Sequence, residues 1–109
     1  MKLPNGERGI VDVQKLRGYC LNPQHPRGRN KARVFASVGF REVDAEELRV
    51  ALLSAASDSE AQMGTANPYG QRYTVDFDLV RRGRTFRIRS TWIIELGAEL
   101  PRLTSCYVL

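Results

Sequence analysis

The sequence contains one histidine, two cysteines and no hydrophobic run of membrane-spanning length. A single histidine excludes an acid–base pair of histidines, and the two cysteines stand in no metal-ligand pattern, which argues against a zinc site. No apolar run approaches the ~18 residues that cross a bilayer. The first twenty residues also lack the apolar centre of a secretory signal. We therefore expect a cytoplasmic protein that needs no metal and no other cofactor. The alternative is export by another route, or as the tail of a larger protein.

Several motifs that commonly carry catalysis are missing as well. There is no phosphate-cradling glycine loop, no paired-carboxylate motif and no nucleophile elbow. Asp76 and Asp78 alternate on one predicted strand, but two carboxylates alone are a weak indication of a metal site. Cys20 and Cys106 are flanked by apolar residues, so we interpret them as small buried side chains. The alternative, a disulfide between them, has no spacing signature.

Positive charge, most of it from arginine, is what the chain has in excess. It has 109 residues, a net charge of +5, and fourteen arginines among its seventeen basic residues. Residues 8–41 hold eight bases against one acid, residues 42–61 six acids against one base, and residues 72–102 seven bases against four acids. Arginine binds phosphate through two parallel hydrogen bonds. This pattern is typical of nucleic-acid binding, and a solvated arginine-rich surface is the alternative.

Hydrophobic spacing predicts helices in the first half of the chain. Asp12 is placed to cap a short helix. A second helix is predicted over residues 30–38, with Gly39 ending it in a left-handed conformation. Asp44 and Glu47 have the spacing of a capping box, which predicts a third helix that ends near residue 57.

The second half has the period of two that is typical of strands. Residues 81–84 read as a hairpin turn between two strands, and residues 102–108 as a closing strand. Residues 58–70 are expected to form a flexible polar connection, and residues 11–13 are a candidate edge strand. One face of the hairpin is apolar and carries Tyr73, Val75, Phe77, Leu79, Phe86, Ile88, Trp92 and Ile94.

These elements predict an α+β fold in a single domain, residues 1–109. N-terminal helices, within about residues 12–57, pack on one face of a C-terminal antiparallel sheet of three to four strands, within about residues 71–108. The other face of the sheet is then open and carries Arg72, Thr74, Arg87, Arg89 and Thr91. Such a row of arginines can bind phosphates, although Asp76 and Asp78 offer cross-strand ion pairs instead.

The only histidine lies in a strongly cationic segment, residues 25–33. His25 is followed by Arg27, Arg29, Lys31 and Arg33. A neutral imidazole can act as a general base near pH 7, and the alternative is a histidine that braces its loop. Cations beside a helix N-terminus, where backbone amides already attract anions, suggest a bound phosphate, although solvent screening is a sufficient explanation for them.

Several longer motifs resemble a bacterial family of small proteins that is designated a domain of unknown function. They are Leu3-Pro4-Asn5-Gly6-Glu7-Arg8, His25-Pro26-Arg27-Gly28-Arg29 with Lys31-Ala32-Arg33-Val34-Phe35, Tyr69-Gly70-Gln71-Arg72-Tyr73, and Pro101-Arg102-Leu103-Thr104 with Cys106-Tyr107. The resemblance covers nearly the whole chain. Members of that family resemble stand-alone proteins encoded beside a second small protein, and also occur as tails of toxin-like proteins. This resemblance implies a toxin with a cognate antitoxin or immunity protein.

The order of helices and then sheet is similar to that of the barnase, EndoU, colicin and RelE-like ribonucleases. These enzymes have no invariant catalytic set, so the similarity transfers no residue roles. They usually have four strands or more, whereas three strands are clear in this sequence.

The first functional hypothesis is a toxin-type, metal-independent endoribonuclease, in which the 2′-hydroxyl of RNA attacks the adjacent phosphate and leaves a cyclic phosphate. His25 would act as base or acid, with Tyr107 or Lys31 as the second proton carrier. Lys31, Arg72 and Arg89 would stabilise the developing charge, and Thr91 or Thr104 would position the phosphate. The residues expected to bind the rest of the RNA are Arg27, Arg29, Arg33, Arg87 and Tyr69.

Two other functions fit the same sequence. One is a non-catalytic module that binds nucleic acid or an acidic protein, which predicts salt-sensitive binding without cleavage. The other is the antitoxin or immunity-like half of a toxin pair, whose basic charge would match an acidic companion.

Overall fold

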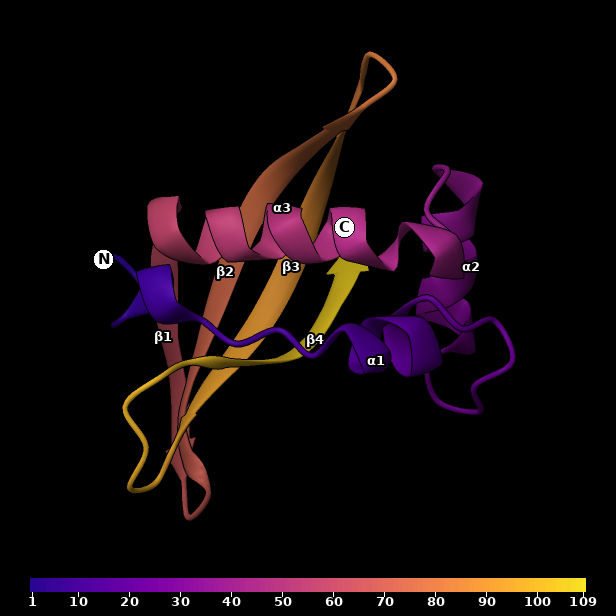
Figure 1. Cartoon of the computed structure of the whole chain (residues 1–109). Helices are drawn as coiled ribbons and strands as arrows, with labels where there is room; N and C mark the ends of the chain where they lie inside the picture. Colours follow the sequence, from indigo (N-terminus) through magenta and orange to yellow (C-terminus); the bar gives the residue numbers. More distant parts are fainter.

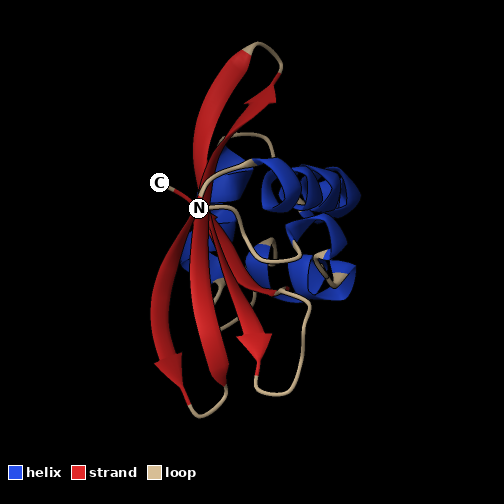
Figure 2. Cartoon of the chain, turned by 90° about the vertical axis from the view of Figure 1, so that its left-hand side faces the viewer, coloured by secondary structure: helices blue, strands red, loops and turns tan.

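The computed structural model describes residues 1–109 as helices packed against a four-stranded antiparallel sheet. The helices precede the strands in the chain and gather against one side of the curved sheet (Figures 1 and 2). This arrangement confirms the predicted α+β class. The helical elements are η1 (Gly6–Arg8), α1 (Val13–Lys15), the π-helical turn η2 (Leu16–Cys20), α2 (Arg29–Ser37), η3 (Glu42–Asp44) and α3 (Ala45–Asp58). The strands are β1 (Ala61–Asn67), β2 (Gly70–Arg81), β3 (Arg84–Glu95) and β4 (Arg102–Val108).

The sheet is a simple meander in the order β1-β2-β3-β4. Strands β2 and β3 form its longest hairpin, paired without interruption from Gly70 opposite Glu95 to Arg81 opposite Arg84. The turn residues Arg82 (φ 51°) and Gly83 (φ 74°) both have positive φ, as a tight two-residue hairpin requires. The predicted hairpin is therefore confirmed.

The apolar face of this hairpin makes the floor of the core. Trp92 is fully buried there, and Tyr73 is 7% exposed, as their positions in the strand pattern predict. The indole N–H of Trp92 donates a hydrogen bond of 2.9 Å to Ser90 Oγ, which in turn donates one of 2.7 Å to the Val75 carbonyl. This short relay gives the buried polar atoms partners inside an apolar layer.

The helical layer covers that floor with the residues that the helical period predicts. Leu48, Leu52 and Ala55 of α3 are buried, and so is Phe35 of α2. Helix α2 ends at Ser37, and Gly39 closes the turn that follows with a φ of 94°, the predicted left-handed conformation. No helix in the structure is both long enough and apolar enough to span a membrane.

The predicted capping box at the start of α3 is wrong. The Asp44 carboxylate accepts a hydrogen bond from the Arg41 backbone N–H (2.9 Å) and thereby closes the preceding turn, η3. Its other oxygen accepts from Arg81 of β2 (3.1 Å), and Glu47 lies 3.1 Å from Arg81 without hydrogen-bond alignment. A cation from the distant hairpin therefore holds both carboxylates that local spacing assigns to the helix N-terminus.

The prediction of a flexible connection over residues 58–70 is also wrong, because α3 continues to Asp58 and β1 follows it. Strand β1 pairs with β2 from Ala61 opposite Val75 to Asn67 opposite Gly70. Only its first residue, Ala61, is buried. An edge strand that contributes one side chain to the core has no period of two to detect.

Residues 11–13 do not form the edge strand for which they were a candidate. The Asp12 carboxylate accepts a hydrogen bond from Gln14 N–H (2.9 Å) and caps α1, which confirms the predicted helix cap. The chain touches the sheet one residue earlier, where Ile10 makes a single parallel bridge to Arg102.

The two cysteines are free and buried, as predicted, and they meet in the core between η2 and β4. A hydrogen bond from the Cys106 thiol lowers the pKa of Cys20 to about 7. The same contact, followed by burial, raises the pKa of Cys106. The pair joins the helical layer to the sheet through residues that are 86 positions apart in the chain.

Candidate functional site

The open face of the sheet is lined by arginine–aspartate pairs. The strand register places Asp76 opposite Arg89 and Asp78 opposite Arg87. Arg89 donates two hydrogen bonds to the Asp76 carboxylate, of 2.9 and 2.8 Å, and Arg87 donates one of 3.1 Å to Asp78. The alternative of cross-strand ion pairs is therefore what the structure shows for these two arginines.

In the Asp76–Arg89 pair, each residue stabilises the charged form of the other. The hydrogen bonds from Arg89 lower the pKa of Asp76. The pKa of Arg89 is raised, first by Asp76 and then by the hydroxyl of Tyr107, its cross-strand partner on β4. Arg89 is thus a fixed cation that is anchored on one side by a carboxylate and faces a tyrosine on the other.

Helix α2 adds a second cation to this tyrosine. The helix lies at the sheet edge beyond β4 (Figure 1), held there by the buried side chains of Ala32 and Phe35. Lys31, which directly precedes Ala32, turns toward β4, and its Nζ lies 4.8 Å from the centroid of the Tyr107 ring. A cation over a tyrosine ring at this distance is an attractive contact.

Two threonines lie next to these three residues. Thr91 and Thr104 have their hydroxyl oxygens 2.6 Å apart, and Thr104 also donates to the Thr91 carbonyl (3.0 Å). Thr91 is opposite Ser105, whereas its neighbour Trp92 is opposite Leu103, so Thr104 is the extra residue of a β-bulge. Because Thr91 follows Arg89 by two positions, both side chains are on one face, about 7 Å apart along the strand. The five residues Lys31, Arg89, Thr91, Thr104 and Tyr107 are called the α2–β4 cluster below.

His25 has a different set of contacts. Its Nδ1 accepts hydrogen bonds from the backbone N–H groups of Arg27 (3.0 Å) and Gly28 (3.2 Å). Its ring meets the ring of Tyr19 edge to face, with centroids 4.7 Å apart. With Nδ1 as acceptor, a neutral ring carries its proton on Nε2, a tautomer that offers no free nitrogen to a general base. The geometry therefore favours loop bracing, in which Tyr19 takes part.

The remaining predicted residues are spread around the cluster. Arg72 is opposite Ile93 and lies diagonally across from Thr91 on the open face. Arg87 is held by Asp78, and Tyr69 is 74% exposed in the turn between β1 and β2. Neither these residues nor His25 form a hydrogen bond, ion pair or ring contact with Lys31 or Tyr107.

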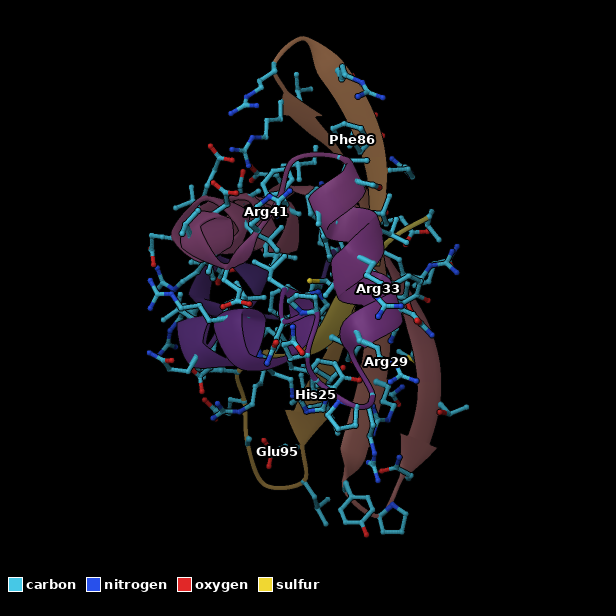
Figure 3. All side chains as sticks on the ribbon, turned by 90° about the vertical axis from the view of Figure 1, so that its right-hand side faces the viewer. His25, Arg29, Arg33, Arg41, Phe86 and Glu95 are labelled. Carbon is cyan, nitrogen blue, oxygen red and sulfur yellow. The ribbon has the colours of Figure 1, made fainter.

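The cations of residues 13–41 form no ion pair, in contrast to the sheet arginines Arg81, Arg87, Arg89 and Arg102. This segment contains no acid, and no carboxylate from elsewhere in the fold pairs with its basic residues. Arg29 and Arg33 are exposed on consecutive turns of α2, with His25 at its N-terminal end (Figure 3). These unpaired residues are Lys15, Arg17, Arg27, Arg29, Lys31, Arg33 and Arg41.

The largest cavity is lined by none of the five cluster residues, although Asp76, the partner of Arg89, is part of its lining. Its volume is about 550 Å³, and it lies between α3 and β2, with carboxylates of Asp58, Glu60 and Asp78 in its lining. Negative charge at this opening disfavours a polyanion. No group of three or more histidine, cysteine, aspartate or glutamate side chains is arranged to hold a metal ion.

A family model described as Domain of unknown function (DUF6883) matches residues 2–109. The chain belongs to the DUF6883 family. The match spans both layers of the fold, so the α2–β4 cluster lies within the DUF6883 domain. No curated protein matches the chain.

The DUF6883 fold also occurs in a solved structure, a contact-dependent growth inhibition toxin–immunity protein complex from Klebsiella pneumoniae 342. One chain of that complex superimposes with a TM-score of 0.67 and 14% identity, covering 93% of this chain and 100% of the other. At this identity the likeness concerns the fold alone.

Proposed function

We propose that this chain is a toxin-type endoribonuclease that cleaves RNA at the α2–β4 cluster without a metal ion. The observation that carries the proposal is the approach of Lys31 to the Tyr107 ring beside Arg89. It places two cations and a proton donor together from two layers of the fold. The likeness to a chain of a toxin–immunity complex supports a toxin that has a cognate small neutralising protein.

The proposed reaction uses the 2′-hydroxyl of RNA as its own nucleophile. The 2′-oxygen forms a bond to the adjacent phosphorus and loses its proton to water, while the bond from phosphorus to the 5′-oxygen breaks. Tyr107 gives its hydroxyl proton to that leaving oxygen. Lys31 and Arg89 stabilise the charge that develops on the phosphoryl oxygens, and the Thr91–Thr104 pair donates a hydrogen bond that positions them.

The unpaired cations of the helical layer supply the binding surface for the rest of the RNA. Arg29 and Arg33 are exposed and compete with no carboxylate for phosphate. Binding through such contacts is strong at low salt and independent of base sequence.

The test is cleavage of end-labelled tRNA and a structured messenger RNA by purified protein in the presence of a chelator. Tyr107→Phe keeps the ring under Lys31 and removes only the hydroxyl, so we expect a rate about 10²–10⁴-fold lower. Lys31→Met keeps the length of the side chain and removes its charge, with a loss of similar size. Tyr19→Phe removes a hydroxyl outside the cluster and is the matched control. Products with cyclic-phosphate ends are expected, and full activity of both cluster variants would contradict the proposal.

A second candidate is a non-catalytic binding module, which includes the immunity-like half of a pair. The observation in its favour is the neutralisation of Arg89 and Arg87 by Asp76 and Asp78, which leaves little free charge on the open face. RNA that is bound in a salt-dependent manner and remains intact would support this candidate instead.

A further inference from the structure

A cleft separates the C-terminal end of α2 from the β2–β3 hairpin. Its volume is about 250 Å³, close to the lower limit for ligand sites in proteins. Figure 3 shows Phe86 on the projecting part of the hairpin beyond one end of α2, with His25 at the other end and Arg29 and Arg33 between them. The residues that line the cleft are Ala36, Ser37, Val38, Gly39, Arg81, Arg82, Arg84 and Phe86.

The cations of this cleft fall into two kinds. Arg81 is committed to the fold, because it bonds to Asp44 and lies 4.4 Å from the Phe40 ring centroid. Arg82 and Arg84 are exposed and have no carboxylate partner, unlike Arg87 and Arg89 on the same hairpin. Neither guanidinium forms an ion pair, although the charge of Arg82 helps to lower the pKa of Asp44 and Arg84 lies against the Phe86 ring.

Helix α2 does not need these two cations at its C-terminus. Its last carbonyl groups are already used, since Gly39 N–H donates to Ala36 (3.1 Å) and Phe40 N–H donates to Phe35 (2.8 Å). The Ser37 hydroxyl donates to Val34 (2.6 Å). Arg82 and Arg84 are therefore free to bind an external anion.

The cleft also offers a planar surface. The Arg84 guanidinium lies 5.3 Å from the centroid of the half-buried Phe86 ring. RNA-binding proteins stack unpaired bases on aromatic rings and on the planes of arginine side chains. A single-stranded nucleotide presents a phosphate next to an unpaired base. The cleft offers two arginines for the phosphate and a planar surface for the base.

We infer that the cleft between α2 and the β2–β3 hairpin binds single-stranded RNA, with a phosphate held by Arg82 and Arg84 and a base stacked on Arg84 and Phe86. This inference rests on the proposed function and adds a second contact region to it. Arg84 precedes Arg89 by five residues on β3, so the cleft lies about 17 Å from the α2–β4 cluster along the strand. Arg29 and Arg33 lie along the same helix as the cleft, so one RNA strand contacts both regions.

The test is binding of a labelled 2′-O-methyl dodecanucleotide, which has no 2′-hydroxyl and cannot be cleaved by the proposed reaction. The variant is Arg82→Asn with Arg84→Gln. Asparagine tolerates the positive φ at position 82, so the turn is kept. The control is Arg8→Gln with Arg102→Gln, which removes the same charge outside the cleft. Circular dichroism and thermal unfolding establish that both double variants are folded.

We expect the cleft variant to bind the dodecanucleotide on the order of tenfold more weakly at ~0.1 M salt, and its salt slope to fall by about 0.7, as loss of one single-strand phosphate contact predicts.

Equal binding of the dodecanucleotide by the cleft variant and the unaltered protein would overturn the inference, and so would an equal loss in the control. Binding of an oligo-glutamate peptide, but no RNA, through Arg82 and Arg84 would assign the cleft to an acidic protein partner and also overturn it. The proposed function is decided separately by cleavage with Tyr107→Phe, so either idea can fail while the other stands.

Discussion

At the scale of single residues, the arginines differ in whether the fold places a carboxylate beside them. Arg87 and Arg89 are held by aspartates across the strands, whereas Arg29 and Arg33 have no acidic neighbour. The charge pattern alone treats all four as phosphate ligands. The difference arises because strand pairing brings a carboxylate to each sheet arginine, while the helical segment has none to offer.

The Asp76–Arg89 pair makes stability depend on acid pH. The pKa of Asp76 is lowered in the folded state, mainly by the hydrogen bonds from Arg89. The contribution is therefore fully present above the unfolded-state value of ~3.9 and is lost as the pH falls through the lower folded-state value. We expect Asp76→Asn to cost about 0.5–1 kcal/mol at pH 7, since both side chains are partly exposed, and less at pH 3. Urea unfolding at the two pH values measures this.

Asp78→Asn is the control for that experiment, because its ion pair with Arg87 is the more exposed of the two. We expect a smaller effect from it. An equal cost of Asp76→Asn at both pH values would show that the pair does not titrate with folding.

Two substitutions of His25 distinguish a role in bracing the loop from a role in proton transfer. His25→Asn keeps a side-chain acceptor for the Arg27 and Gly28 amides, whereas His25→Ala removes it. If the imidazole only braces the loop, RNA cleavage by His25→Asn should stay within a few-fold of the unaltered protein, and His25→Ala should lose about 1 kcal/mol of stability. A loss of 10²–10⁴-fold in cleavage by a folded His25→Asn would instead restore His25 as a proton carrier.

At the scale of elements, tight approaches of the backbone set the geometry of the sheet. Gly70, at the start of β2, has φ 151°, and an added Cβ would lie 2.2 Å from the Ile94 carbonyl oxygen. The Asn67 carboxamide accepts from Tyr69 and Gly70 N–H and holds the same turn. Strand β1 depends on this turn, because its own side chains are almost all exposed.

Gly70→Ala should therefore destabilise the protein by about 3 kcal/mol, from the unfavourable φ and the clash with β3. Gly18, in η2, has open space around its Cα and ordinary φ. Gly18→Ala should be neutral or stabilising by up to ~1 kcal/mol, since alanine restricts the unfolded chain. Urea unfolding of both variants measures the difference, and equal stabilities would contradict the argument.

At the scale of the whole molecule, free positive charge is densest over residues 15–41, where no basic residue forms an ion pair, and the sheet adds the unpaired Arg72, Arg82 and Arg84. The sheet arginines Arg87 and Arg102 are ion-paired with Asp78 and Glu95, in contrast to the cations of η2 and α2. The proposed RNA path therefore follows α2 rather than the open sheet face.

RNA affinity should accordingly respond to the helical cations more than to the paired ones. Arg29→Gln with Arg33→Gln should reduce the slope of log affinity against log salt by about 1.4, which corresponds to two single-strand phosphate contacts. Arg87→Gln with Arg102→Gln removes the same formal charge and should leave the slope nearly unchanged. Fluorescence anisotropy over a salt series measures both slopes, and equal reductions would place RNA on both layers.

The sequence by itself determined those features that depend on local periodicity and turn chemistry. The period of two in residues 72–94 and the Arg82-Gly83 turn were sufficient for the β2–β3 hairpin, and the helical spacing of Leu48, Leu52 and Ala55 was sufficient for α3. These signals are local because each residue faces the same side as its neighbours one period away.

The tertiary structure alone decided the rest, because it concerns partners that are distant in the chain. The Asp44 carboxylate binds Arg81 of β2 and does not cap α3, the role that local spacing predicts for it. Lys31 meets Tyr107 only because α2 lies beside β4. Strand β1 forms through backbone hydrogen bonds, which any sequence without proline can make and which no side-chain pattern records. The position of the proposed site is thus a property of the packed layers, while the residue types that it uses are already visible in the sequence.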